Sequence, residues 1–182
     1  HSGTGWQTQG ESKLTMKTLN PGKQSLKNSF LALAAPYQQE LAILQTAPGI
    51  SSDFTAIGII SEIGTNMEAF PSAKHLCSWA GLTPTNNESA GKKKSVRVSK
   101  AGCYIKPLLV QCANAVVKST KHPEMRNRYL RLKKRRGHKK AIIAIARMLL
   151  TALYHMLKNG ENYNAELYRK FSDLPPVTVK LR

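Results

Sequence analysis

Ser89 begins the stretch Ser-Ala-Gly-Lys, the part of the sequence best suited to chemistry on a phosphate. A serine hydroxyl attacks phosphorus when a base removes its proton and nearby donors or cations stabilise the developing charge. Gly91 allows a phosphate to approach the backbone closely, since it has no side chain. Five cations follow within the same polar segment, residues 83–102: Lys92, Lys93, Lys94, Arg97 and Lys100. The segment is therefore expected to be a basic loop that carries a candidate nucleophile.

The same loop has a second interpretation that involves no catalysis. Glu88 is the only carboxylate near Ser89, so the sequence offers no obvious partner to remove the serine proton. Composition alone favours this interpretation, a flexible basic loop that only clamps phosphates and in which Ser89 is a turn residue.

A second cluster of cations lies further along the chain, where residues 126–140 hold nine basic residues. That density exceeds what a helix needs for solvation and predicts contacts with nucleic-acid phosphates, without distinguishing DNA from RNA. Tyr129 is interleaved, and its ring can pack either in the core or against a sugar or base. The expected phosphate-binding residues are Arg128, Arg131, Lys133, Lys134, Arg135, Arg136, Lys139 and Lys140.

Both clusters belong to one strongly basic block. The chain of 182 residues has a formal net charge of +18, and 18 of its 28 basic residues lie between Lys92 and Arg147, with Glu124 as the single acid there. The remaining residues are nearly neutral. This asymmetry predicts a polyanionic partner and excludes an acidic solvating protein.

A third feature is the turn Ala47-Pro48-Gly49-Ile50 between two apolar helical patterns. It resembles the corner of a helix-hairpin-helix, in which backbone N–H groups near a glycine such as Gly49 bind a DNA phosphate. Ser51 stands where that motif usually has its second glycine. An ordinary corner between two helices remains the alternative.

The sequence predicts no metal site or cofactor within the chain. Its acids form no Asp-x-Asp or helically spaced pair, and its histidines are isolated. Cys77, Cys103 and Cys112 fit neither a disulfide framework nor a zinc motif, so a reducing cytoplasm is expected. The longest apolar run is interrupted by Arg147 and Thr151, and no membrane partner is predicted.

Apolar periodicity and capping residues predict an all-α fold. We expect a disordered N-terminal leader over residues 1–28, a helical domain over 29–170 and a loose tail over 171–182. Within the domain, helices are expected from residue 29 to 44 with a break at Pro36, and at 53–63, 73–80, 104–117, 123–135 and 139–159. A weak strand is expected at 95–98.

Seven short stretches occur in a fixed order: Pro48-Gly49-Ile50, 59–64, 70–73, 78–84, 87–92, 108–111 and 139–147. Together they resemble the C-terminal transposase domain of the Piv-type DEDD transposases. That family includes site-specific DNA invertases and bridge-RNA-guided insertion-sequence recombinases. The resemblance spans about residues 33–168, most of the chain.

The resemblance implies a role for Ser89. In that family the C-terminal domain supplies a serine nucleophile that forms a covalent phosphoserine–DNA intermediate. The family motif Ser-(Ala/Gly)-Gly-Lys falls on residues 89–92, whereas Ser95 and Ser99 lie outside it. The family often has glycine near Ser95 and asparagine after the glycine that matches Gly102, where this chain has Cys103. These departures concern the flexibility of the loop more than the nucleophile.

The resemblance also implies a missing partner domain. The family's N-terminal half is RuvC-like and carries four acidic Mg²⁺ ligands, and nothing before Leu33 resembles it. We therefore expect a C-terminal portion of a bacterial, cytoplasmic transposase that binds DNA but performs little strand transfer alone. Mg²⁺ would be held by the missing domain, a guide RNA is the partner in RNA-guided relatives, and a homo-oligomer is expected for the full-length protein. The alternative is a non-enzymatic helix-hairpin-helix module that binds DNA or RNA.

Overall fold

A computed structural model describes residues 25, 28–29, 32–83, 88–89, 92–93 and 102–169. The chain divides into two units, 1–36 and 37–182. The expected disordered leader falls almost entirely outside the described residues, and the tail over 171–182 lies wholly outside them. The described part is helical apart from two strands of two residues each, which confirms the all-α prediction.

The second unit begins with two helices joined by a short turn. A 3₁₀ helix, η1 (Ala35–Tyr37), includes Pro36, where a break was expected, and α2 (Gln38–Gln45) follows it. After the turn comes α3 (Asp53–Ile63), which starts at a capping serine: the Ser52 hydroxyl accepts a hydrogen bond from the Thr55 amide at 3.2 Å. Gly64 ends α3 with a φ of 70°. The predicted helix at 53–63 is thus confirmed.

A short 3₁₀ helix, η2 (Met67–Ala69), leads to α4 (Ala73–Trp79). Ser72 caps α4, since its hydroxyl accepts from the His75 amide. The chain then turns at Gly81, and the Leu82 amide donates to the Cys77 carbonyl at 2.9 Å. Leu82 is buried. The segment that leads into the basic loop is therefore fixed to α4 as far as Leu82.

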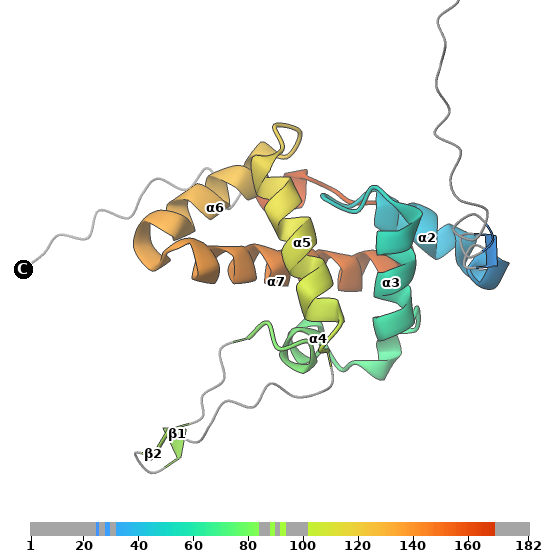
Figure 1. Ribbon diagram of the computed structural model, residues 1–182, viewed down its shortest axis with the longest axis horizontal. Coiled ribbons are helices and arrows are strands. Elements are labelled where there is room, and N and C mark those ends of the chain that lie inside the picture. Colours follow the sequence, from blue (N-terminus) through green and yellow to red (C-terminus); the bar gives the residue numbers. More distant parts are fainter. Residues whose placement is uncertain are drawn as a thin grey trace, which may run out of the picture. The chain divides into compact units, whose positions relative to one another are not determined.

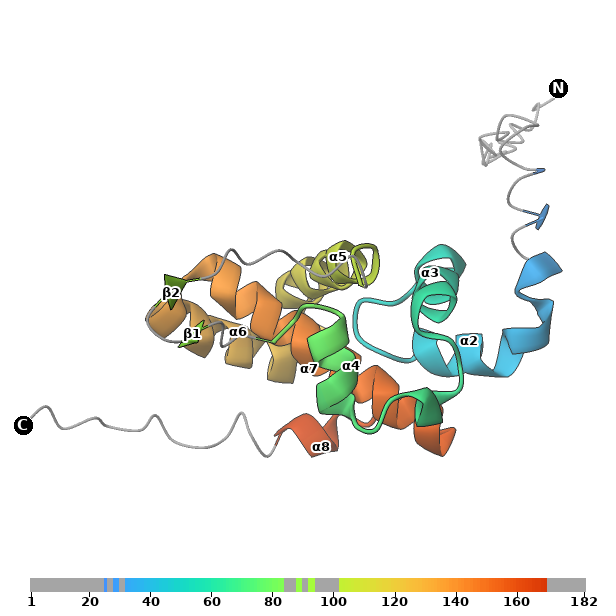
Figure 2. The ribbon, with the colours of Figure 1, turned by 90° about the horizontal axis from the view of Figure 1, so that it is seen from below.

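Three longer helices complete the fold: α5 (Ile105–Lys118), α6 (Pro123–Arg136) and α7 (His138–Asn159). Figure 1 shows α5 crossing α7 and α6 lying beside α7. The turn at Gly137 joins the end of α6 to the start of α7. Figure 2, turned by 90°, shows the same pairing of α6 with α7. The helices predicted at 104–117, 123–135 and 139–159 are confirmed to within one residue at each end.

The central element is α7, which packs against α2, α4, α5 and α6. Its inward side is buried from Ala141 to Met156. By length and composition alone α7 could span a membrane. Its contacts with four other helices instead identify it as the core helix of this unit.

Besides the two 3₁₀ helices, two small elements were not predicted from the sequence. One is α8 (Glu166–Arg169), which packs on α6. The other is a hairpin of β1 (Glu88–Ser89) and β2 (Lys92–Lys93). The strand expected at 95–98 lies outside the described residues.

Candidate nucleic-acid interface

Ser89 lies in the antiparallel pair β1–β2. The register sets Glu88 opposite Lys93 and Ser89 opposite Lys92, with residues 90 and 91 joining the strands. A connection of two residues is the shortest common hairpin link and favours glycine, which Gly91 supplies in the sequence. The backbone thus places the predicted nucleophile and the motif lysine at paired positions. Gly91, Lys94, Arg97 and Lys100 lie outside the described residues.

The basic loop leaves and re-enters the helical unit at one place. Its return stem, Gly102, has a φ of 77°, and a Cβ there would lie 2.7 Å from the Cα of Ala80 and 2.8 Å from the carbonyl oxygen of Trp79. Only glycine fits such an approach between two backbones. At the other end of the segment that carries Ser89, Leu82 is buried and its amide donates to the Cys77 carbonyl. Both ends of the segment are therefore held against the C-terminal end of α4.

The corner between α2 and α3 has a different environment from the one expected for phosphate binding. Gly49 has a φ of 79°, and a Cβ there would lie 2.7 Å from the Cys112 carbonyl oxygen and 2.7 Å from Cγ2 of Val116. The glycine is therefore explained by close packing against α5. The Ile50 amide donates to the Ala47 carbonyl at 3.2 Å. Binding of a phosphate by Gly49 remains a prediction that the fold does not require.

The cations of the second cluster gather around the turn between α6 and α7. Lys133, Lys134, Arg135 and Arg136 occupy the last turn of α6, where the helix dipole favours positive charge. Lys139 and Lys140 lie in the first turn of α7, where the dipole disfavours it, and that turn contains no acid. All six residues are exposed. Helix stability therefore does not explain the cations in the first turn of α7, whereas a bound polyanion would.

Arg128 and Arg131, also predicted to bind phosphates, lie earlier on α6. Arg131 is exposed, whereas Arg128 is half-buried. Burial, with a smaller effect from the charge of Arg131, lowers the pKa of Arg128. A guanidinium remains charged under ordinary conditions. The half-buried Arg128 is thus less accessible to a partner than its exposed neighbours.

Tyr129 is buried rather than available to a base. Its hydroxyl lies 2.8 Å from Nδ1 of His138 and joins α6 to the first residue of α7. Lys133 Nζ lies 5.9 Å from the centre of the tyrosine ring. Of the two positions considered from the sequence, packing in the core is the one observed. The hydrogen bond fixes the junction that carries the six cations.

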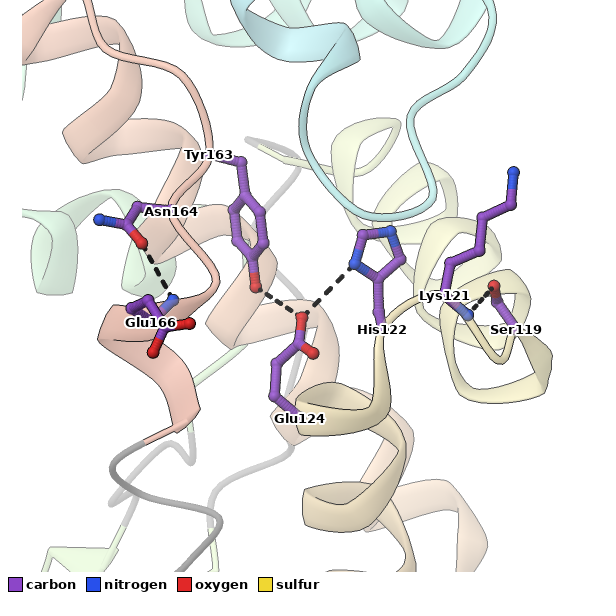
Figure 3. Close-up of polar contacts among 7 residues, drawn as sticks. All are labelled: Ser119, Lys121, His122, Glu124, Tyr163, Asn164 and Glu166. Carbon is purple, nitrogen blue, oxygen red and sulfur yellow. Dashed lines mark hydrogen bonds and ion pairs between the residues drawn. The ribbon is translucent and has the colours of Figure 1, made fainter.

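Glu124, the single acid of the basic block, is buried at the start of α6 (Figure 3). The Tyr163 hydroxyl donates to its Oε1 at 3.2 Å, and His122 Nδ1 lies 3.4 Å from the same oxygen. The Tyr163 amide in turn donates to Oγ1 of Thr46 in the α2–α3 corner, at 2.9 Å. The cluster thus ties the C-terminal segment to both α6 and the corner.

Sequence reasoning missed this cluster. Its partners lie 39 residues apart, and only the isolation of Glu124 among cations could have drawn attention to it. Burial and the neighbouring Glu124 raise the pKa of Tyr163, so its hydroxyl stays a donor through the neutral range.

The cysteines offer no reactive site in the helical core. Burial raises the pKa of Cys112 to about 11 and also raises that of Cys77, whose thiol lies 3.5 Å from the Thr151 hydroxyl. Both thiols are therefore protonated at neutral pH and unreactive. Among the residues that the structure describes, no group of three His, Cys, Asp or Glu side chains could hold a metal ion.

Comparison with known proteins finds similarity to one family of transposases. Residues 41–130 match the model of the transposase IS116/IS110/IS902 family. A curated relative, the insertion element IS110 uncharacterized 43.6 kDa protein of Streptomyces coelicolor, is 28% identical over 127 residues. The alignment covers 69% of this chain but only 30% of that protein. No solved structure matches the chain. These findings support a transposase domain in this chain.

Proposed function

We propose that this chain is the DNA-binding, serine-bearing part of a transposase or site-specific recombinase, with Ser89 as the nucleophile. The observation that carries the proposal is the family match over residues 41–130, a range that includes Ser89-Ala90-Gly91-Lys92. The backbone register supports it, because it pairs the position of Ser89 with that of the motif lysine, Lys92, and a cation near the attacking oxygen would favour the charge that develops in the transition state.

In the proposed reaction, the Ser89 oxygen attacks a DNA phosphorus atom. A Ser89 O–P bond forms, and the bond from phosphorus to one deoxyribose oxygen breaks. The serine proton passes to a base, and the leaving oxygen takes up a proton. A second deoxyribose hydroxyl then attacks the phosphoserine, restores the serine and joins the new strands.

The described residues do not fit a Mg²⁺ ion, since they bring no three candidate ligands together. We therefore derive no step through a metal in this chain. A RuvC-like domain with four acids is proposed to hold Mg²⁺ and to supply the base. The chain spans about 30% of the curated relative's length, which leaves room for such a domain in a protein of that size. Assembly into a homo-oligomer, pairing with a guide RNA and a bacterial cytoplasmic location belong to the same proposal.

The helical unit positions both the DNA and the segment that carries Ser89. The junction of α6 and α7 presents Lys133, Lys134, Arg135, Arg136, Lys139 and Lys140 to the phosphates of the duplex. The locked stems at Leu82 and Gly102 hold the nucleophile-bearing segment to the same rigid unit. Catalysis of this kind depends on such positioning.

The test is to trap the intermediate. The chain is combined with a RuvC-like half and with a suicide DNA whose cleavage releases a short strand, and covalent complexes are separated in denaturing gels. The proposal expects an adduct with wild type and Ser95→Ala and none with Ser89→Ala. Equal adduct in wild type and Ser89→Ala would contradict it and leave the non-enzymatic helix-hairpin-helix module as the better description.

A further inference from the structure

The outward side of α6 carries an unusual set of exposed side chains. α6 packs against α5, α7 and α8 and buries Met125 and Tyr129 on its inward side. Figure 1 shows it at one end of the helical unit, beside α7. On its outward side, exposed residues recur at intervals of three and four, the spacing of one helix face. This outer face of α6 consists of Arg126, Asn127, Leu130, Arg131, Lys134 and Arg135.

The stability of α6 does not account for the cations of the outer face. A solvated helix face gains stability from acids placed three or four residues from cations, but the only acid of α6, Glu124, is buried. Arg131 and Arg135 are like charges four residues apart, a spacing that destabilises a helix. Arg126 lies in the first turn, where the helix dipole disfavours positive charge. The dipole favours cations only in the last turn.

Two uncharged side chains, Asn127 and Leu130, lie among these cations. Asparagine is a poor residue for a helix interior, because its amide competes with the backbone for hydrogen bonds. Within the described part of the chain, the Asn127 amide makes no hydrogen bond that offsets this cost. Leu130 is 49% exposed. An amide that can donate and accept is thus presented to solvent beside an apolar side chain.

The cations lie on both sides of this pair. At about 100° per residue around a helix, Leu130 and Asn127 are about 60° apart. Arg126 lies about 40° beyond Leu130, whereas Arg131 and Arg135 lie about 40° and 80° beyond Asn127. The outer face therefore has a centre that can make hydrogen bonds and apolar contacts, and two positively charged edges.

The major groove of B-form DNA has the complementary arrangement. It is about 12 Å wide and admits an α-helix, whose diameter with side chains is about 10 to 12 Å. Phosphates line both rims of the groove, and base edges form its floor. Adenine offers a donor and an acceptor that match an asparagine amide, and thymine offers a methyl group that apolar side chains contact. The narrow major groove of an RNA duplex does not admit side chains, so the fit favours DNA.

We propose that α6 reads the sequence of duplex DNA in the major groove. Asn127 and Leu130 contact base edges and determine specificity, while the cations on the two edges of the outer face bind the flanking phosphates. The stretch from Asn127 to Lys134 rises about 10 Å, which corresponds to about three base pairs. The inference deepens the proposed function, on which it rests for DNA as the partner.

The first experiment selects, from duplexes with a randomised centre, those that the 182-residue chain binds, and sequences them. Wild type is expected to enrich a motif of about three base pairs that includes an A·T pair. Asn127→Ala should lose the preference at one position and bind the selected duplex about tenfold more weakly, with its affinity for unselected duplexes changed less than twofold. Leu130→Ala should relax a neighbouring position. Asn159→Ala, at an exposed asparagine that ends α7, is the matched control and should change neither affinity.

The second experiment places the contact in the major groove. Replacing the preferred adenine by 7-deazaadenine removes the N7 acceptor and leaves the minor groove unaltered. Wild type should lose about tenfold in affinity for the modified duplex, whereas Asn127→Ala should lose less than twofold, because its contact is already absent. The absence of an enriched motif, the same motif in Asn127→Ala, or an equal loss of affinity in both proteins would overturn the proposal.

Controls separate base contacts from phosphate contacts and from folding. Arg126→Ala and Arg135→Ala, on opposite edges, should weaken binding to selected and unselected duplexes alike and reduce the salt slope by about 1 each. The melting temperature of Asn127→Ala should equal or exceed that of wild type, since alanine is the better helix former. Neither experiment requires cleavage. A chain that forms the Ser89 adduct but enriches no motif would overturn this inference alone and leave the proposed function intact.

Discussion

Ser89 is the cross-strand partner of Lys92 in the antiparallel pair β1–β2. The first and last residues of the Ser-Ala-Gly-Lys stretch are thereby placed at neighbouring backbone positions, although two residues separate them in the chain. The hairpin belongs to a segment whose stems are locked at Leu82 and Gly102. This relationship connects a local motif with the helical unit behind it.

The close packing of Gly102 against α4 predicts that one added methyl group at this position lowers the free energy of unfolding. Gly102→Ala combines a φ of 77° with a Cβ 2.7 Å from another backbone and should lower the free energy of unfolding by about 3 kcal/mol. Gly160→Ala is the matched control, since Gly160 has a φ of 67° but nothing within 4 Å, and should cost only about 1 kcal/mol. Urea unfolding measures both. Equal costs would show that the close approach to Ala80 contributes nothing.

The cluster around Glu124 predicts a difference between two substitutions. Glu124→Gln keeps an acceptor for the Tyr163 hydroxyl and should cost about 1 kcal/mol. Glu124→Ala leaves that buried hydroxyl without its acceptor and should cost about 3 kcal/mol. Chemical denaturation at pH 7 checks the order, with the exposed Glu161→Ala as a control expected to change stability by less than about 0.5 kcal/mol. The same loss in both variants would refute a stabilising hydrogen bond.

Buried thiols predict a loss of stability at alkaline pH. Folding raises the pKa of Cys112 from 9.0 to about 11, so the folded state retains the proton longer than the unfolded state. The protonated Cys112 thiol therefore contributes fully to the free energy of unfolding below pH 9. This contribution, about 2 to 3 kcal/mol, is lost as the pH rises toward 11. Cys77, Tyr163 and Tyr168, whose pKa values burial also raises, act in the same direction. Cys112→Ala should flatten the pH dependence, and an unchanged profile would contradict this account.

The exposed cations at the α6–α7 junction predict salt-dependent binding. Replacing Lys134 and Arg135 together by alanine should reduce the slope of log affinity against log salt by about 1 for each DNA phosphate that the variant no longer neutralises. Lys158→Ala, at the other end of α7, should leave the slope unchanged. Fluorescence anisotropy at several salt concentrations with a DNA duplex measures the slopes. A slope that does not respond to the double substitution would remove this junction from the interface.

The helices of this fold were predictable because their signals are local. Ser52 and Ser72 cap α3 and α4, Gly64 and Gly160 follow the helices that they end, and the apolar spacing of α7 matches its buried face. Contacts between distant residues were not predictable. Gly49 must be a glycine because it packs closely against α5, and Gly102 must be one because it packs closely against the backbone of Ala80. The Glu124–Tyr163 pair also depends on tertiary packing that no local pattern encodes.

The candidate site was predictable in composition more than in arrangement. The sequence located the cations and the serine, and the fold added the pairing of Ser89 with Lys92 and the locked stems. Tyr129, considered for base contact, is instead buried against His138.

The central claim is that Ser89 becomes covalently attached to DNA. The most direct measurement is to digest the trapped complex with nuclease and trypsin and to locate the remaining nucleotide by tandem mass spectrometry. The account predicts a nucleotide phosphate on Ser89 and none in the Ser89→Ala protein. A phosphate on Ser95 or Ser99, or an adduct that survives in Ser89→Ala, would contradict it.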